Sequence, residues 1–359
     1  MKKGAYISDI VNQGIIDGIF CIESSKILTT KNGDPYLALT LMDKTGSIEA
    51  RLWDLPPNFT PPEQGSFLKV TAEVQTFRDN LQLKIIKIEP VSIEVTNPEE
   101  FLPVTSFDRK VLWNKIKHFI KSIKDPVLRP VLDWIFSDLG FKKAIYNAPA
   151  AKKVHHAYIG GLLEHTLGVT RLADKIVDMY DYLDRNLLIS GALVHDIGKI
   201  KEFKYDSPPI DYTDEGRLIG HLVLGSNIVD EASKSVGISL NNPRIIALKH
   251  LILSHHGQRE FGAVVEPMTE EAMVLYMVDD LDAKLNYLCA LKKELDKTDN
   301  GRCWTSFQHL MGRYFFLSPL KEDIEEIEES HTNRKKEKDF FKNIQSTLWS
   351  LEDKKDDSD

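Results

Sequence analysis

The stretch LLISGALVHDIGKIKEF (residues 187–203) places His195 and Asp196 side by side at the end of an apolar run. Lys199 follows three residues after the aspartate. An ionised carboxylate in apolar surroundings is unstable unless it is paired, hydrogen-bonded or bound to a metal ion. The stretch therefore predicts a buried helix that ends at a metal site, and the remaining ligands must come from elsewhere in the chain.

The composition is that of a soluble globular protein. The 359 residues exceed one typical domain core and predict two domains. Hydrophobic residues make up 42% of the chain and charged residues 28%. The apolar runs are too short to predict a membrane span. The first residues do not have the pattern of a signal peptide. Cys21, Cys289 and Cys303 form no CxxC motif, which predicts a cytoplasmic protein and excludes a cysteine-based zinc cluster.

The charge argues against nucleic-acid binding through bulk electrostatics. The formal net charge is −8 and the pI is about 5.8, whereas such proteins usually carry a basic domain or stripe. Residues 1–95 hold 10 Lys and Arg against 12 Asp and Glu, a balance of −2. Any nucleic-acid binding would therefore depend on local grooves, base stacking or metal ions.

Residues 1–95 predict a small β-barrel. Five segments rich in β-branched and aromatic residues are separated by turn sequences such as KNGD and DKTG. Five strands without an intervening helix predict the oligonucleotide-binding (OB) fold. A small barrel with no role beyond packing is the alternative. The predicted strands are residues 18–30, 35–43, 46–54, 66–77 and 81–91.

The apolar spacing becomes helical in the second half, so the predicted fold class is α+β with a barrel followed by an all-α bundle over residues 108–317. The polar, proline-containing residues 96–107 are the predicted linker. Residues 205–221 interrupt the helical pattern and predict a short hairpin or loop beside the site. The densely charged residues 318–359 predict a disordered or peripheral helical tail.

Seven side chains of metal-binding type fall at the ends of apolar helical runs. A single histidine in such a place is more often a satisfied core residue than a ligand, but their joint occurrence favours a metal site. Imidazole together with carboxylate suits Fe, Mn or Zn. The seven residues are His165, His195, Asp196, His221, His255, His256 and Asp279.

The ordered series H…HD…H…HH…D resembles the HD-domain metal-dependent phosphohydrolase superfamily, in the version with extra histidines for a second metal. The flanking sequences NAPAAKKVHHAYIGGLLEHTLGV, HDIGKIKEF and GRLIGHLVLG, together with the N-terminal barrel, are similar to the bacterial YhaM-type 3′-to-5′ exoribonucleases. The resemblance covers the chain except for its charged tail.

The resemblance implies two divalent ions that share one carboxylate. It places one ion on His165, His195, Asp196 and Asp279, and the other on Asp196, His221, His255 and His256. Two ions about 3.5–4 Å apart activate water and neutralise the attacking and leaving oxygens of a phosphodiester. A carboxylate has two oxygens and can join them. Manganese is the expected metal, with iron and zinc as alternatives.

Lys199 is the second predicted catalytic residue after Asp196. If the helix continues past His195, all three side chains share a face, and the lysine can hold a phosphate oxygen. The alternative is a solvated lysine at a helix end. Asp282, one turn beyond Asp279, is expected to orient a ligand, and Arg217 either contacts phosphate or is an exposed loop residue.

The barrel residues predicted to contact nucleic acid are aromatic and basic. Bases of single strands stack on aromatic side chains beside a cationic groove, although such aromatics more often fill a barrel core. The candidates are Phe20, Tyr36, Trp53, Phe77 and Arg78.

The resemblance predicts a metal-dependent 3′-5′ exoribonuclease that hydrolyses single-stranded RNA by a metal-activated hydroxide; the polarity comes only from the resemblance, and hydrolysis of single-stranded DNA is left open. It also implies a homo-oligomer and no membrane partner. One alternative is a phosphodiesterase or phosphohydrolase for cyclic dinucleotides or nucleotides. Another is a non-catalytic RNA-binding protein with structural metals.

Overall fold

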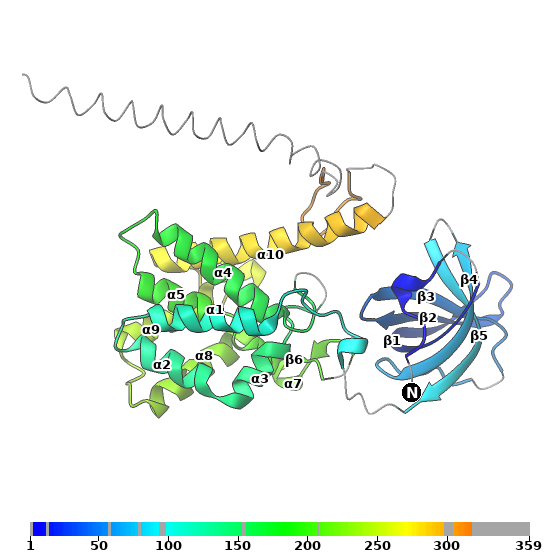
Figure 1. The fold of residues 1–359 in the computed structure, drawn as a ribbon, viewed down its shortest axis with the longest axis horizontal. Helices are drawn as coiled ribbons and strands as arrows, with labels where there is room; N and C mark the ends of the chain where they lie inside the picture. Colours follow the sequence, from blue (N-terminus) through cyan, green and yellow to red (C-terminus); the bar gives the residue numbers. More distant parts are fainter. Residues whose placement is uncertain are drawn as a thin grey trace, which may run out of the picture. The chain divides into compact units, whose positions relative to one another are not determined.

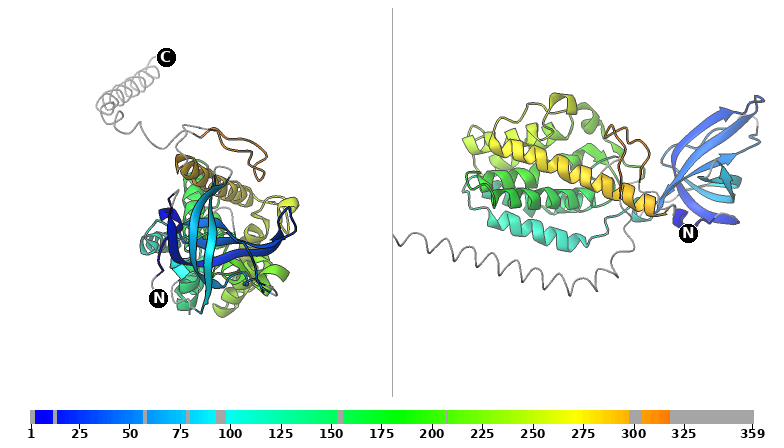
Figure 2. Two further views of the ribbon diagram at one scale, coloured as in Figure 1. Left: turned by 90° about the vertical axis from the view of Figure 1, so that its right-hand side faces the viewer. Right: turned by 90° about the horizontal axis from the view of Figure 1, so that it is seen from above.

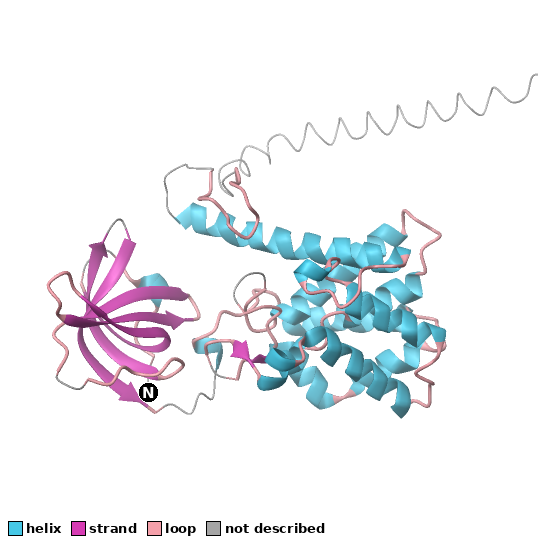
Figure 3. Ribbon diagram, turned by 180° about the vertical axis from the view of Figure 1, so that it is seen from behind, coloured by secondary structure: helices cyan, strands magenta, loops and turns pink. Residues whose placement is uncertain are grey.

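The structure is a computed structural model, in which the N-terminal part consists mainly of strands and the second part mainly of helices, with one small hairpin among them (Figure 3). It describes residues 3–11, 14–56, 59–77, 80–92, 98–152, 156–206, 208–297 and 304–317.

The first part is a closed barrel in the order β1-β2-β3-β5-β4 (Figure 1). Strand β1 pairs antiparallel with both β2 and β4, and β3 pairs parallel with β5, which closes the barrel. This arrangement confirms the predicted five-stranded OB barrel. The strands are β1 (Ile15–Thr29), β2 (Pro35–Asp43), β3 (Gly46–Leu52), β4 (Phe67–Phe77) and β5 (Asn80–Val91).

The alternation along β2 explains why this segment is a barrel strand. Leu37, Leu39 and Leu41 are buried in the barrel core, while Ala38 and Thr40 between them are only half-buried. Successive side chains of a strand point to opposite faces, so every second residue fills the interior. The core therefore sets the register of β2.

The second part is a helical bundle, which Figure 2 shows from two further directions. Its first helix begins at Asp108, whose carboxylate accepts a hydrogen bond from Lys110 N at 2.7 Å. The helices are α1 (Arg109–Ser122), α2 (Leu128–Ser137), α3 (Leu139–Asn147), α4 (Gly161–Val177), α5 (Arg185–Val194), α6 (Lys199–Glu202), α7 (Asp214–Leu218), α8 (His221–Ser235), α9 (Pro243–Ser254) and α10 (Glu270–Lys297). Short 3-10 turns are Ile7–Asp9, Pro98–Glu100 and Arg259–Phe261.

Helix α5 is the central element of the bundle. Every residue from 187 to 194 is buried, and α5 packs against both α4 and α9. Gly191 allows the close approach of α9, because a Cβ atom there would lie 2.3 Å from the side chain of Leu251. The predicted buried helix before His195 is therefore confirmed.

The all-α expectation for the second part needs one correction. A two-stranded hairpin, β6 (Phe203–Lys204) and β7 (Asp211–Tyr212), lies within it and is followed by α7. The sequence predicts a short hairpin or loop over residues 205–221; a hairpin forms, but its first strand, Phe203–Lys204, lies just before that range. Strand β6 follows α6 and strand β7 precedes α7. Because α6 and α7 pack together, the chain between them must reverse direction within a few residues, and the hairpin makes this reversal.

By compactness the chain divides into residues 1–286 and 287–359, a division that falls within α10. In the second unit, Trp304 pairs with Phe316 and Gln308 with Arg313 through single bridges. The boundaries predicted at 95, 108 and 317 stay predictions, and the predicted tail lies outside the described residues. Across the described helices, a search for a segment long and apolar enough to span a bilayer finds none.

Ile116→Ala in α1 should lower the free energy of unfolding by about 2–5 kcal/mol, because Ile116 is completely buried and its removal leaves a cavity. Val111→Ala on the same helix is the matched control, since Val111 is 49% exposed and should change stability by less than about 0.5 kcal/mol. Urea unfolding followed by tryptophan fluorescence measures both. An equal loss of unfolding free energy in the two variants would contradict the burial of Ile116 and the exposure of Val111.

Candidate metal centre

The end of α5 positions the site. His195 and Asp196 directly follow the buried helix and are themselves 0% and 2% exposed. The Nδ1 atom of His195 donates to Ala192 O at 2.9 Å, which fixes the ring with Nε2 directed away from α5. The core therefore orients this histidine.

A first group of ligand-type atoms gathers on one side of Asp196. His165 Nε2, on α4, lies 3.0 Å from Asp279 Oδ1 of α10 and 3.4 Å from Asp196 Oδ2. His195 Nε2 lies 3.5 Å from each of the same two oxygens. The two histidine Nε2 atoms are 3.2 Å apart. Four side chains from three parts of the bundle thus surround one point.

A second group lies at the other oxygen of Asp196. His221 Nε2, at the start of α8, and His255 Nε2, just after α9, are each 3.5 Å from Asp196 Oδ1. His256 Nε2 is 3.2 Å from His221 Nε2. The two oxygens of one carboxylate therefore face two different groups.

The hydrogen bonding of the second group fits a cation. His255 Nδ1 donates to Ile252 O at 2.8 Å and His221 Nδ1 donates to a carboxylate, which leaves Nε2 of each ring as the atom that can offer a lone pair toward Asp196. Two buried atoms of this group, Asp196 Oδ1 and His255 Nε2, have no hydrogen-bond partner. Buried acceptors facing acceptors require a positive charge between them.

The spacing fits as well. Ligand atoms held about 2.1 Å from an ion lie about 3.0–3.4 Å from one another, close to the separations in both groups. Imidazole and carboxylate donors suit Mn, Fe or Zn. The residues present therefore fit divalent transition-metal ions.

The two groups differ in their protonation. Burial opposes a charge on His195, yet Asp196 and Asp279 raise its pKa to about 9. Burial, together with His255 and His221, lowers the pKa of His256 to about 3. The first group therefore attracts positive charge strongly, and His256 in the second is neutral and ready to act as a ligand.

Two carboxylates behind the histidines fix their rings. Asp282 Oδ2 accepts from His165 Nδ1 at 2.7 Å and lies 3.0 Å from His156 Nε2. Glu202 Oε1 accepts from His221 Nδ1 at 2.9 Å and from His221 N at 3.1 Å. Carboxylates in this position fix the tautomer of a metal-binding histidine and increase its basicity. The sequence predicted this role for Asp282 and missed Glu202.

Lys199 belongs to the site, although the helix does not continue as predicted. Helix α5 ends at Val194, a turn follows, and α6 begins at Lys199. The turn still brings Lys199 Nζ to 2.6 Å from Asp196 Oδ2. Burial disfavours its charge, but the contact with Asp196 raises the pKa of Lys199 above its ordinary value, so the side chain is an ammonium.

A cavity of about 330 Å³ opens onto both groups. It is lined by Lys199 and by four of the candidate metal ligands, namely His221, His255, His256 and Asp279. Residues that sequence reasoning missed complete the wall. They are chiefly Lys152, Tyr212, Phe261 and Tyr276.

Arg217 does not line this cavity; it pairs with Asp211 at 2.9 Å. Its phosphate contact stays a prediction.

Of the barrel residues predicted to contact nucleic acid, the structure contradicts one, and the others stay predictions. Phe20 is completely buried in the barrel core, so its prediction as a stacking residue is wrong; its position in β1 points inward. Trp53 is 40% exposed and stacks on Tyr36 with ring centroids 4.7 Å apart. Phe77 is 58% exposed, and Arg78 lies outside the described residues.

The HD domain family matches residues 162–284, which contain all seven candidate ligands. The 3′-5′ exoribonuclease YhaM of Bacillus pumilus is 37% identical over 80% of this chain and 90% of the relative. YhaM of Bacillus subtilis is 35% identical over 80% of this chain and 90% of the relative. The chain belongs to the YhaM 3′-5′ exoribonuclease family. The HD domain implies dependence on divalent metal ions.

Geobacillus YhaM is 33% identical over 88% of this chain and 95% of the relative. Among solved structures, the second OB-fold domain of replication protein A from Methanococcus maripaludis covers 25% of this chain and 98% of its own, at 24% identity and a TM-score of 0.21. The fold of the barrel rests on its own strand order.

Glu202→Ala should weaken metal binding about 10- to 100-fold, because His221 then loses the acceptor that fixes its ring. Metal content after dialysis against graded chelator measures this. Glu215→Ala on neighbouring α7 is the control, since Glu215 is exposed and makes no side-chain contact with the histidines. An unchanged metal content in the Glu202 variant would refute the orienting role.

Proposed function

We propose that this chain is a metal-dependent 3′-5′ exoribonuclease that hydrolyses phosphodiester bonds of single-stranded RNA at a two-metal site. The observation that carries the proposal is the position of Asp196, whose Oδ2 faces one ligand group and whose Oδ1 faces the other. Family membership supports the reaction and its polarity.

In this proposal two ions, most simply manganese, share Asp196. When bound, such ions activate water and neutralise charge on the phosphodiester oxygens. The first group of His165, His195, Asp196 and Asp279 holds one, and the second group of Asp196, His221, His255 and His256 holds the other.

Lys199 serves the site in two ways. Its Nζ holds Asp196 Oδ2 at 2.6 Å, which fixes the plane of the shared carboxylate. The same ammonium lines the cavity, where it can hold a phosphate oxygen. A positive charge fixed in a buried site stabilises developing negative charge more effectively than one in water.

Residues 1–95 serve as the RNA-binding domain, joined by residues 96–107 to the catalytic residues 108–317. The exposed Trp53–Tyr36 pair and Phe77 offer faces for base stacking. Because the barrel carries a balance of −2, this binding is weak, salt-sensitive and tolerant of sequence. The use of DNA, the homo-oligomeric state and a cytoplasmic location stay predictions.

Asp196→Ala should abolish RNA cleavage and remove metal from both positions, because one side chain contacts both groups. The assay uses Mn²⁺, RNA labelled at its 5′ end and, in parallel, a cyclic dinucleotide. The wild-type chain should give a ladder that shortens from the 3′ end. Asp178→Ala is the control, since Asp178 is an exposed partner of Lys175 and does not line the metal cavity.

Cleavage of the cyclic dinucleotide alone would favour a small-molecule phosphodiesterase. No turnover of either substrate by metal-loaded protein would favour a non-catalytic role. Full activity of Asp196→Ala would exclude a shared carboxylate.

Trp53→Ala should weaken binding of a long RNA by about 1–3 kcal/mol, the range for loss of one stacked base. Hydrolysis of a dinucleotide, too short to reach the barrel, should keep its kcat/KM. Fluorescence anisotropy and initial rates measure the two effects. Tyr182→Ala is the control, because Tyr182 is 70% exposed and lies in the α4–α5 connection. Equal losses on both substrates would argue against stacking.

A further inference from the structure

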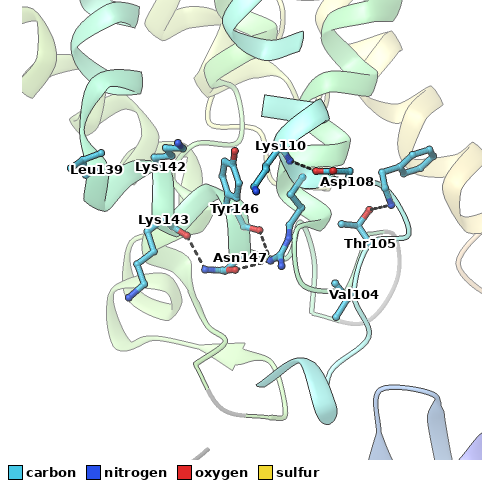
Figure 4. Close-up of a pocket in the computed structure, with 11 residues that line it drawn as sticks. Val104, Thr105, Asp108, Lys110, Leu139, Lys142, Lys143, Tyr146 and Asn147 are labelled. Atoms are coloured by element: carbon cyan, nitrogen blue, oxygen red, sulfur yellow. Dashed lines mark hydrogen bonds between the residues drawn. The ribbon is translucent and has the colours of Figure 1, made fainter. Parts of the chain in front are cut away.

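A second cavity, of about 600 Å³, lies outside the metal centre (Figure 4). The linker residues Val104, Thr105 and Phe107 form one wall, and the beginning of α1 and one face of α3 form the others. None of its lining residues belongs to either ligand group. The cavity is large enough for a nucleotide unit.

This cavity is strongly basic in a chain of net charge −8. Lys110, Lys142 and Lys143 line it; in Figure 4 Lys110 and Lys142 lie on either side of Tyr146, and the side chain of Lys143 extends away from that ring. In the part of the chain that the structure describes, none of these ammonium groups forms an ion pair with a carboxylate. The one carboxylate in the wall, Asp108, is occupied by capping α1. Three cations therefore remain available to an anion.

The cavity also offers aromatic surface and rigid support. The ring of Tyr146 lies 5.5 Å from Lys142 Nζ, and Phe107 at the mouth is 57% exposed. Arg109 donates to Asn147 Oδ1 at 2.8 Å and to Tyr146 O at 3.2 Å, which ties α1 to the end of α3. Cations beside aromatic faces are the combination that binds single-stranded nucleic acid.

Two connections join this cavity to the metal centre, one through the chain and one through a hydrogen bond. Asn147 lines the basic cavity and Ala150 lines the metal cavity, so only two residues, Ala148 and Pro149, separate the two walls along the chain, a span of at most about 11 Å. Thr105 Oγ1 also donates to Glu164 Oε2 at 2.5 Å, and Glu164 directly precedes His165. One RNA strand can therefore reach both cavities within a few nucleotides.

We propose that the cavity formed by Lys110, Lys142, Lys143 and Tyr146 binds phosphates and a base of the RNA strand on the 5′ side of the scissile phosphodiester. The inference rests on the proposed exoribonuclease function and deepens it. Linker residues Val104, Thr105 and Phe107 form one wall, so this cavity lies where the chain passes from the linker into the bundle. It holds the strand while its end is hydrolysed.

The test is the variant Lys110→Ala/Lys142→Ala/Lys143→Ala in the full chain. The control variant Lys115→Ala/Lys124→Ala/Lys234→Ala removes the same charge from exposed lysines that line neither cavity. Anisotropy measures binding of a 12-nucleotide oligo(A) RNA with phosphorothioate linkages at its 3′ end. Initial rates measure hydrolysis of the dinucleotide ApA with Mn²⁺.

The cavity variant should raise the Kd for the 12-nucleotide RNA roughly 10- to 100-fold, and the slope of log Kd against log salt should fall by about 2, since three phosphate contacts are lost. Its kcat/KM for ApA should stay within about twofold of wild type. The control variant should leave both unchanged.

Three results would overturn the proposal: an unchanged Kd, an equal effect in the control variant, or an equal loss on ApA. Competition by AMP provides a fourth. If AMP displaces the RNA from wild type at concentrations near the RNA's own Kd but does not do so from the cavity variant, the cavity binds free nucleotide instead of the strand. If wild type cleaves no RNA at all, the proposed function fails, while the anisotropy arm still tests the cavity.

Discussion

A single carboxylate, that of Asp196, holds the centre together, and the position of α5 makes this possible. Burial of an ion is unfavourable unless strong partners surround it. Asp196 has Lys199 at 2.6 Å and histidines on both of its oxygens. Because α5 is buried along its whole apolar stretch, the carboxylate that follows it cannot move into solvent. The bundle core thus requires partners for Asp196, and those partners form the site.

The same carboxylate gives the two groups different characters. The first group contains a second carboxylate, Asp279, and attracts positive charge, whether protons or metal ions. The second has three imidazoles and only one oxygen of Asp196. Carboxylates behind the rings, Asp282 for His165 and Glu202 for His221, give each group one firmly oriented histidine. Each ligand group therefore has a histidine oriented by a carboxylate, but the first group carries more negative charge than the second.

The structure brings together the seven side chains that residue type and order singled out, and their division into two ligand sets stays a prediction from the family resemblance. The sequence also predicted β2, where leucines alternate. It failed for Phe20, because an aromatic residue in a strand has the same appearance whether it points inward or outward. It missed Glu202, since nothing local distinguishes this glutamate from an exposed one. Its role comes from α6 packing beside α8, a contact between elements that periodicity does not reveal.

The acidic charge of the chain is compatible with RNA binding because electrostatic attraction is local. At physiological ionic strength the Debye length is about 8 Å, so exposed charges farther away contribute little. A net charge of −8 spread over 359 residues is then less important than three lysines around one cavity. With a slightly acidic barrel that binds by stacking and a basic cavity near the metals, electrostatic attraction for RNA increases toward the site of hydrolysis. A strand that shortens from its end would keep the contacts nearest the metals longest.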